Sequence, residues 1–491
     1  MAKGTYGLPK KTASAIYIIY ILLFLIVMVQ FVSSTEIENL YCVVIPLALA
    51  CLVLPFVLNA LAGLGADKGR RTTIILLSAC ILVKLAWVLI FRTEPESDYL
   101  MFYETAVQLS ESWRIANSYV ALFPHIMGYA TFLSLFFKVF GAGLLVAPVI
   151  NVLLSAVSMY LIHFITTRLF GKKAGIIASI LWIFLPSQTV YNTMVLSEPY
   201  YTTLILAFFA VLIKVSDGPK TSGWARIFLL ALASGVLLAL INASRPLAAI
   251  LIIALVISLG INLRRADKKA LAKRGAYLLI TAALFFISTS VNTYYCSSRL
   301  GQDVAESAGY SVYVGFNERS SGSWNIEDSG TLDAAVSEQD GNAKLAQEQM
   351  METAKSRIFE GSINFPKLFL DKLQVLWAYD SMAYYYSDIE NHAVLFVSVL
   401  NAYFYFMVIF SIIALIAAIR RGDTSLTLIL VLYVLGLTAA HMLVEVSARY
   451  HYSAIVPILI LSASGLSRAG RRKRIQSTAD QAEDTGIAPV F

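Results

Sequence analysis

The chain has 491 residues, of which 58% are hydrophobic and only 14% are charged. Soluble domains carry about 25% charged residues, so this composition excludes an ordinary soluble enzyme and indicates a protein with many membrane-spanning segments. The formal net charge is +7, but the basic residues occur in short clusters between apolar runs. Such clusters indicate membrane orientation rather than a surface that binds nucleic acid. The four cysteines have neither metal-ligand spacing nor the pattern of a disulfide framework.

The apolar runs are continuous over about twenty residues and do not alternate, which is typical of transmembrane helices rather than barrel strands. We therefore predict an all-α polytopic membrane protein. The first run follows a basic start without a small-residue cleavage site, so we interpret it as a retained span. About twelve spans are expected, at 13–33, 41–64, 72–91, 143–165, 174–193, 198–215, 223–241, 245–262, 274–294, 393–419, 424–444 and 449–466.

The charged loops predict the orientation of these spans. If the count is correct, the basic clusters fall on one side, which the positive-inside rule makes cytoplasmic, together with both termini. The opposite loops are acidic, polar or long. The basic clusters are Lys3, Lys10 and Lys11; Lys68, Arg70 and Arg71; Arg168, Lys172 and Lys173; Arg264, Arg265, Lys268, Lys269, Lys273 and Arg274; Arg420 and Arg421; and Arg468, Arg471, Arg472, Lys473 and Arg474.

Two outer loops are too long to be simple connectors. The first, 92–142, contains an apolar stretch at 123–140 that is short for a span and fits an interfacial helix. The second, 295–392, is the only substantial soluble part; we expect a polar helix at 332–360 and a more apolar helix at 367–377. The expected organisation is two additional N-terminal helices (1–71), a transmembrane core (72–294), the outer loop (295–392), C-terminal helices (393–467) and a basic, disordered tail (468–491).

Ionisable residues gather at the outer ends of the predicted spans. Any one of them alone is more often a solvated or snorkelling charge, but their concentration on one face indicates a polar cavity that opens outward. Lys84, inside a span, is equally well explained by snorkelling or by function. The outer-face group comprises Asp98, Glu198, Arg245, Lys372, Glu445, Arg449 and His451.

The chemistry of such a cavity suits an anionic substrate carried by a lipid. Arginine and lysine bind phosphate, and an aspartate can take a proton from an attacking hydroxyl. The sequence has no P-loop and no glycine-rich strand-to-helix turn, and the predicted cytoplasmic loops are too short for a nucleotide-sugar domain. Within the first outer loop, Asp98 lies among Glu94, Glu96 and Glu104, which are most simply solvated charges.

Several short motifs resemble those of the GT-C integral-membrane glycosyltransferases, specifically bacterial relatives of the protein O-mannosyltransferases and aminoarabinose transferases. The resemblance extends from about Ile81 to Gly465. It rests on the order and spacing of Ser97-Asp98 with Tyr103 and Ala106, the helix at 123–140, the turn at 167–174, Leu196-Ser197-Glu198-Pro199, Ser244-Arg245-Pro246, and Arg449-Tyr450-His451 with Pro457.

The resemblance implies a polyprenyl-phosphate sugar donor, inversion at the anomeric carbon and an acceptor attacked on the outer side. By that similarity Asp98 is the general base, and Glu198 orders the acceptor, a cation or the base. Arg245, Lys372 or Arg449 binds the donor phosphate. Further candidate substrate-binding residues are Tyr103, His125 and His451, together with Asn317 and Trp324 from a loop, 309–325, that we expect to cover the site.

The sequence also departs from the family pattern. Tyr99 follows Asp98 where a second acid is usual, and two spans precede the one that resembles the family's first span. A divalent cation, which Asp98 and Glu198 would hold, is therefore only one option, and no other cofactor is expected. The expected partners are the donor lipid, a cell-envelope acceptor (wall polymer, lipid glycan or protein) and the plasma-membrane bilayer, without nucleic acid.

Two other functions remain open at this stage. A transporter or flippase of lipid-linked sugars also fits twelve spans with both termini inside, although no repeat relates the two halves and the polar groups lie on one face. A glycan ligase or polymerase would use a diphosphate-linked donor on a related architecture.

Overall fold

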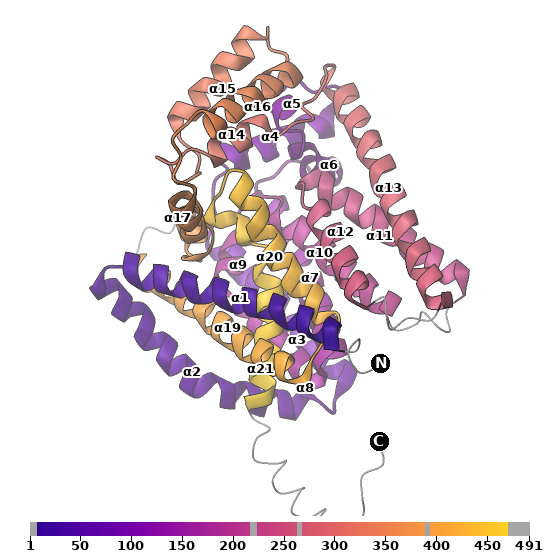
Figure 1. The fold of residues 1–491 in the computed structure, drawn as a ribbon, viewed down its shortest axis with the longest axis vertical. Coiled ribbons are helices and arrows are strands. Elements are labelled where there is room, and N and C mark those ends of the chain that lie inside the picture. The colour runs from indigo at the N-terminus through magenta and orange to yellow at the C-terminus, as the bar shows by residue number, and fades with distance from the viewer. Residues whose placement is uncertain (1–6, 217–222, 263–267, 388–392, 470–491) are drawn as a thin grey trace, which may run out of the picture.

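The structure, a computed structural model, describes residues 7–216, 223–262, 268–387 and 393–469 (Figure 1). Helices and turns account for these ranges, and no strand occurs in them. The predicted all-α polytopic class is confirmed. Of the residues that carried expectations, Lys3, Arg264, Arg265 and nearly all of the C-terminal tail lie outside the described ranges.

Within the described ranges, eight helices are long and apolar enough to cross a membrane. They coincide with eight of the twelve predicted spans. Their bounds are α1 Gly7–Ser34, α2 Ile37–Gly65, α3 Gly69–Ile90, α7 Val146–Phe170, α10 Glu198–Ser216, α11 Trp224–Ser244, α13 Lys268–Leu300 and α19 Ala393–Arg421.

The other four predicted spans are shorter or interrupted helices. The segment 174–193 is divided into α8 (Lys172–Ile183) and α9 (Pro186–Tyr191), because Pro186 cannot continue α8 and instead begins a new helix. The remaining three are α12 (Ala248–Asn262), α20 (Thr427–Leu443) and α21 (Ile455–Ala469), the last preceded by the 3₁₀ turn η2 (Ala448–His451). Irregular backbone therefore lies between several of these helices, where polar side chains can gather.

The first long loop forms α4 (Ser97–Glu111), α5 (Ser118–Leu122) and α6 (Ile126–Phe140). The last of these is the short apolar helix expected at 123–140. Its Gly128 lies directly against the end of α11: a Cβ atom there would be 2.3 Å from the carbonyl oxygen of Ala243. α6 is thereby packed against the last turn of α11, immediately before Arg245.

The second long loop forms α14 (Gly309–Gly315), α15 (Ile326–Glu338), α16 (Ala343–Phe359), α17 (Phe365–Trp377) and α18 (Met382–Tyr385). The prediction of one polar helix over 332–360 was wrong. Asp340 and Gly341 have φ angles of 51° and 79°, and this left-handed backbone ends α15 before α16 begins. The apolar helix expected at 367–377 is confirmed as α17.

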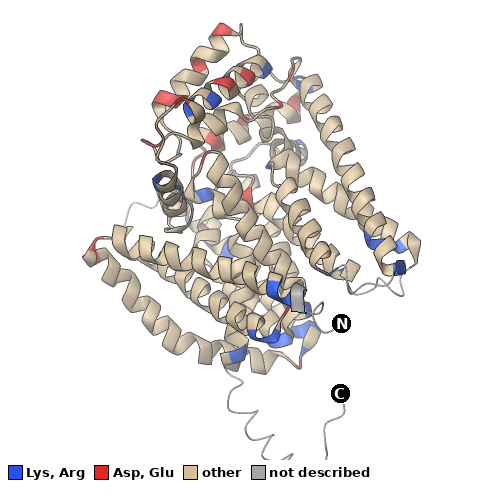
Figure 2. Ribbon diagram, in the orientation of Figure 1, with Lys and Arg blue, Asp and Glu red and all other residues tan. Residues whose placement is uncertain are grey.

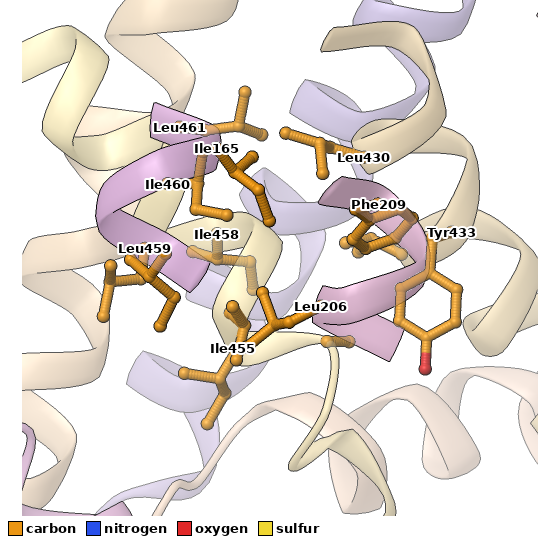
Figure 3. Packing of buried hydrophobic residues seen from close by; sticks show 14 of the residues in the cluster. Ile165, Leu206, Phe209, Leu430, Tyr433, Ile455, Ile458, Leu459, Ile460 and Leu461 are labelled. Carbon is orange, nitrogen blue, oxygen red and sulfur yellow. The ribbon is translucent and has the colours of Figure 1, made fainter. Parts of the chain in front are cut away.

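The C-terminal helix α21 lies in the centre of the apolar core. Figure 3 shows its residues packed against α7, α10 and α20. Nearly every residue of α21 is buried, whereas α1 and α2 expose many large apolar side chains, as a lipid-facing pair does. The core residues labelled in Figure 3 are Ile165, Leu206, Phe209, Leu430, Tyr433, Ile455, Ile458, Leu459, Ile460 and Leu461.

Acidic residues are concentrated at one end of the molecule, whereas Lys and Arg occur at both ends (Figure 2). Figure 2 shows Lys and Arg gathered around the start of α1, the start of α8 and the end of α19, and Asp and Glu concentrated around α15 and α16 at the opposite end. This separation agrees with the predicted basic clusters that fall within the described ranges. The second outer loop and α4–α6 lie together at the acidic end (Figure 1).

The packing of α6 on α11 gives a first prediction. Gly128→Ala should lower the stability of the detergent-solubilised protein by about 1–3 kcal/mol. The added methyl group would overlap the backbone of Ala243 and Ser244, which can shift only if α11 moves. The unfolding temperature measures this change. Gly143→Ala is the matched control, since a Cβ there finds its nearest atom at 3.8 Å. Equal unfolding temperatures for the two variants would contradict the prediction.

Candidate active site

Two carboxylates and two arginines meet where α4, α10, α11 and η2 begin or end. The guanidinium of Arg449 donates from Nη2 to Asp98 Oδ2 over 2.8 Å, and its Nε lies 3.3 Å from Glu198 Oε1. Arg245 Nη2 donates to the same Glu198 oxygen over 3.2 Å. We call Asp98, Glu198, Arg245 and Arg449 the charged network. It joins four of the residues that the sequence placed on one face.

Local sequence explains why these side chains lie at helix ends. Asp98 and Glu198 occupy the first turns of α4 and α10, where the helix dipole favours negative charge. Arg245 is the residue at which α11 ends, and Pro246 follows it. Ser97, next to Asp98, has a φ of 49°, an uncommon conformation for a residue with a side chain. Strain of this kind is often associated with functional sites.

The members of the network differ in access to solvent. The side chain of Glu198 is 1% exposed and that of Arg449 is 7% exposed, whereas that of Asp98 is 45% exposed. Burial alone raises the pKa of Asp98, but the adjacent Arg449, with help from Arg245, more than offsets this and lowers the pKa overall. Asp98 is therefore an accessible, ionised carboxylate in the ground state, whereas Glu198 is enclosed between two guanidinium groups.

Aromatic rings surround the guanidinium of Arg449. Its central carbon lies 5.6 Å from the ring centroid of Tyr99 and 5.7 Å from those of Tyr386 and Tyr450. Arg245 lies 4.9 Å from the ring of Tyr450. Such contacts stabilise a partly desolvated cation. No role was predicted for these tyrosines, and the only sequence signal for one is that Tyr99 and Tyr450 lie beside motif residues.

Glu445 is a third carboxylate near the network. It accepts a hydrogen bond from Tyr450 Oη over 3.1 Å and forms no ion pair within the described part of the chain. Burial raises the pKa of Glu445, and the negative charge of Asp98 adds to this, while the Tyr450 hydrogen bond and the two arginines oppose it. Glu445 was included in the outer-face group but not among the predicted catalytic residues.

Two predicted substrate-binding residues come from the first outer loop. His125 precedes α6, and burial, together with Arg245, lowers its pKa to about 3, so it is a neutral ring near the network. The hydroxyl of Tyr103 donates to the carbonyl oxygen of Ala142. Tyr103 thus connects α4 to the segment after α6, and no contact places it in the charged network.

Lys372, predicted to bind phosphate, is instead buried among backbone carbonyls. Its ammonium donates to Gly315 over 2.8 Å, Met442 over 3.0 Å and Val444 over 2.7 Å, which uses all three N–H groups. Burial lowers the pKa of Lys372 to about 7, although Glu445 opposes this. In this conformation Lys372 connects the outer loop to the segment before η2.

The remaining predicted residues do not join the charged network. His451 has both ring nitrogens within hydrogen-bonding distance of Leu376 O and Asp380. Asn317 donates to Asp328 over 2.9 Å, inside a polar cluster of the outer loop. Trp324 is 59% exposed in that loop. A substrate-contacting role for these residues stays a prediction.

The carboxylates do not form a donor set for a divalent cation in this arrangement. The carboxylate oxygens of Asp98 and Glu198 contact guanidinium groups. They therefore do not point together at one position where a cation could bind. No cluster of three or more His, Cys, Asp or Glu residues capable of holding a metal occurs among the described residues. The site as arranged is suited to an anion, which arginines bind, more than to a cation.

The site's central segment matches a known family. Residues 125–292 match the profile of the dolichyl-phosphate-mannose-protein mannosyltransferases, PMT_2. Over these residues the chain is similar to that GT-C family. The match contains Glu198 and Arg245 and confirms, over this segment, the resemblance and the class of enzyme expected from the sequence. No characterised protein matches the chain at the level of sequence.

Solved structures support the fold. The apo oligosaccharyltransferase of Archaeoglobus fulgidus is 12% identical, with a TM-score of 0.52, over 86% of this chain and 53% of that one. The oligosaccharyltransferase AglB of the same organism, in complex with an inhibitory peptide and a dolichol-phosphate, is 11% identical over 85% and 52%, with a TM-score of 0.48. This chain spans about half the length of these proteins, and the first of them shows a shared GT-C fold.

The environment of Lys372 gives a second prediction. Lys372→Met should lower the unfolding temperature strongly, because three buried carbonyls lose their donor and each unpaired group costs about 1–3 kcal/mol. The measurement is thermal unfolding of the purified protein. Lys367→Met is the control on the same helix, since that side chain is 56% exposed. An undiminished unfolding temperature in the Lys372 variant would show that the ammonium does not support the loop.

Proposed function

We propose that the protein transfers a sugar from a polyprenyl-phosphate carrier to an acceptor on the outer face of the membrane, with inversion. The observation that carries this proposal is the charged network, in which two arginines and an accessible aspartate meet at helix ends. The family match supports the choice of donor, because its description names a dolichyl-phosphate sugar and a protein mannosyltransferase.

In this proposal the donor phosphate binds Arg449 and Arg245. Guanidinium groups bind phosphate through paired N–H donors, and the two arginines are neighbours because both contact Glu198. Glu198 is 1% exposed, so its role is to hold and neutralise the arginines from the buried side while their other N–H groups face the ligand.

Asp98 acts as the general base. In the free protein its interaction with Arg449 makes it a weak base, since an opposite charge stabilises its ionised form. A phosphate on Arg449 competes for that guanidinium, which raises the proton affinity of Asp98 when the donor is bound. Asp98 then takes the proton of an acceptor hydroxyl while the oxygen of that hydroxyl bonds to the anomeric carbon. The bond from that carbon to the phosphate oxygen breaks, and the anionic polyprenyl phosphate leaves on the arginines.

The distribution of charge supports the proposed membrane orientation. Since the basic clusters lie at the end opposite the acidic outer loops (Figure 2), the positive-inside rule makes the basic end cytoplasmic, with both termini, and the acidic end external. The network and the helices of both long loops then face the acceptor's compartment. The family description makes a protein the first acceptor to test, with wall polymers and lipid glycans as further candidates.

The role of Asp98 gives a third prediction. Asp98→Asn should reduce transfer of labelled sugar from a polyprenyl-phosphate donor by about 10²–10⁴-fold, the typical contribution of a general base. The assay uses membranes or reconstituted protein. Glu104→Gln is the matched control, because it removes an exposed carboxylate from the same helix, α4, and should leave transfer unchanged.

Full activity of the Asp98→Asn variant would overturn the assignment of the base. Movement of sugar-lipid across the bilayer without any glycosidic product would favour a flippase. Preference for a diphosphate-linked donor over a monophosphate-linked one would favour the ligase or polymerase.

The pH dependence distinguishes Asp98 from Glu445 and forms a fourth prediction. A base works when deprotonated, and kcat/KM reports the free protein. Because the adjacent Arg449 holds the pKa of Asp98 below the ordinary range of an aspartate, kcat/KM should stay level as the pH falls through the range in which an ordinary glutamate titrates. Burial raises the pKa of Glu445, so kcat/KM should already decline above that range if Glu445 were the base. In the donor complex, the acid limb of kcat should move to higher pH, because phosphate weakens the Arg449 contact.

A further inference from the structure

His451, at the end of η2, lies in a fully enclosed position. Its ring is parallel to the indole of Trp377, with centroids 5.3 Å apart and an interplanar angle of 9°, and to the ring of Phe404, at 5.9 Å and 12°. The residue is 3% exposed. Aromatic rings from α17 and α19 therefore lie parallel to the imidazole and contribute to its enclosure.

The edges of the imidazole are also occupied. Nδ1 lies within hydrogen-bonding distance of the backbone carbonyl of Leu376, which can only accept, so Nδ1 carries a hydrogen. Nε2 lies 3.1 Å from Asp380 Oδ1. The proton between them belongs either to an imidazolium beside a carboxylate or to a carboxylic acid that donates to a neutral ring. In both cases the pair is neutral overall, which suits a buried position.

Asp380 is fixed in turn by α19. Its backbone N–H donates to Asn401 Oδ1 over 2.9 Å, and the residue is 4% exposed. His451 is thus held by the end of α17, by the segment after it and by α19. Two residues earlier on the same 3₁₀ turn is Arg449, whose guanidinium contacts Asp98 and Glu198.

We propose that Asp380 and His451 form a buried positioning pair, which fixes η2 and thereby holds Arg449 between Asp98 and Glu198. His451 is 3% exposed and both of its ring nitrogens have partners, so in this proposal the pair acts through Arg449 and does not contact substrate, a role that replaces the substrate-binding role predicted for His451. The pair sets the geometry of the anion-binding arginine. Its effect on donor binding rests on the function proposed above, whereas its effect on Arg449 does not.

The test measures the coupling between the pair and Arg449. Arg449→Gln should lower the unfolding temperature of the wild-type background, because Asp98 loses its cation and the buried Glu198 keeps only Arg245. In an Asp380→Ala background, where Arg449 is already displaced, Arg449→Gln should lower the unfolding temperature by much less. In an Asp380→Asn background, Arg449→Gln should lower the unfolding temperature by as much as in wild type. The reason is that the asparagine amide can donate to Nε2 of a neutral His451, which still donates to Leu376. Equal drops in all backgrounds would overturn the proposal.

Two further variants keep this test decisive. If Asp380→Ala cannot be recovered as folded protein, His451→Asn replaces it: the asparagine amide can donate to Leu376 in place of Nδ1, while the contact with Asp380 is lost. Tyr277→Phe is the control for loss of a buried hydrogen bond elsewhere, since its hydroxyl lies 2.6 Å from Ser234 Oγ between α11 and α13. Tyr277→Phe should lower the unfolding temperature, but Arg449→Gln should cause the same further decrease in this background as in wild type.

The activity measurement separates the two proposals. With a polyprenyl-phosphate sugar as donor, Asp380→Ala or His451→Asn should raise the donor KM more than it lowers kcat, with a combined loss of about 10- to 100-fold, as expected for a misplaced binding group. Asp380→Asn should remain close to wild type. An unchanged donor KM in an active protein overturns the pair's effect on the donor. A wild type without transfer activity overturns the proposed function, while the stability coupling still decides the positioning pair.

Discussion

The site depends on one buried cation. Arg449 is 7% exposed and lies between two carboxylates from different helices, and a buried charge is tolerated only when it is paired. Since Glu198 is shared with Arg245, the two guanidinium groups repel each other and remain together only because that carboxylate, and an anionic ligand when bound, offset the repulsion. This constraint explains why helices distant in sequence must end at the same point, and why aromatic rings line the remaining surface of the cation.

Backbone interruptions create the space for this network. Pro186, Pro199 and Pro246 lie at the starts of α9 and α10 and after the end of α11, positions at which proline interrupts a helix. Helix ends also expose backbone groups whose partial charges favour ions of opposite sign. Lys372 also links the second outer loop to the chain that leads into η2. Its ammonium donates to the carbonyl of Gly315 in α14 and to the carbonyls of Met442 and Val444 before η2.

Much of the fold could be predicted from the sequence, because hydrophobic length and the distribution of basic residues act locally along the chain. The predicted spans coincide with helices, and α6 and α17 are found where short apolar helices were expected. The division of 332–360 at Asp340 and Gly341 was missed, since a left-handed turn leaves little trace in a polar stretch. Asp98, Glu198, Arg245 and Arg449 were recognised as candidates from their place at span ends, but their pairing was not, because each pair joins residues far apart in sequence.

The sequence by itself determined that the chain is a helical membrane protein with charged residues concentrated at one face, since these properties follow from composition and from the spacing of polar residues along each span. Only the tertiary structure decided which of those charges meet. It placed Lys372 among backbone carbonyls, enclosed His451 beside Trp377 and Phe404, and left Asp98 accessible beside Arg449. The physical reason is that burial and ion pairing depend on what neighbouring helices bring to the same point, and a one-dimensional pattern does not contain that information.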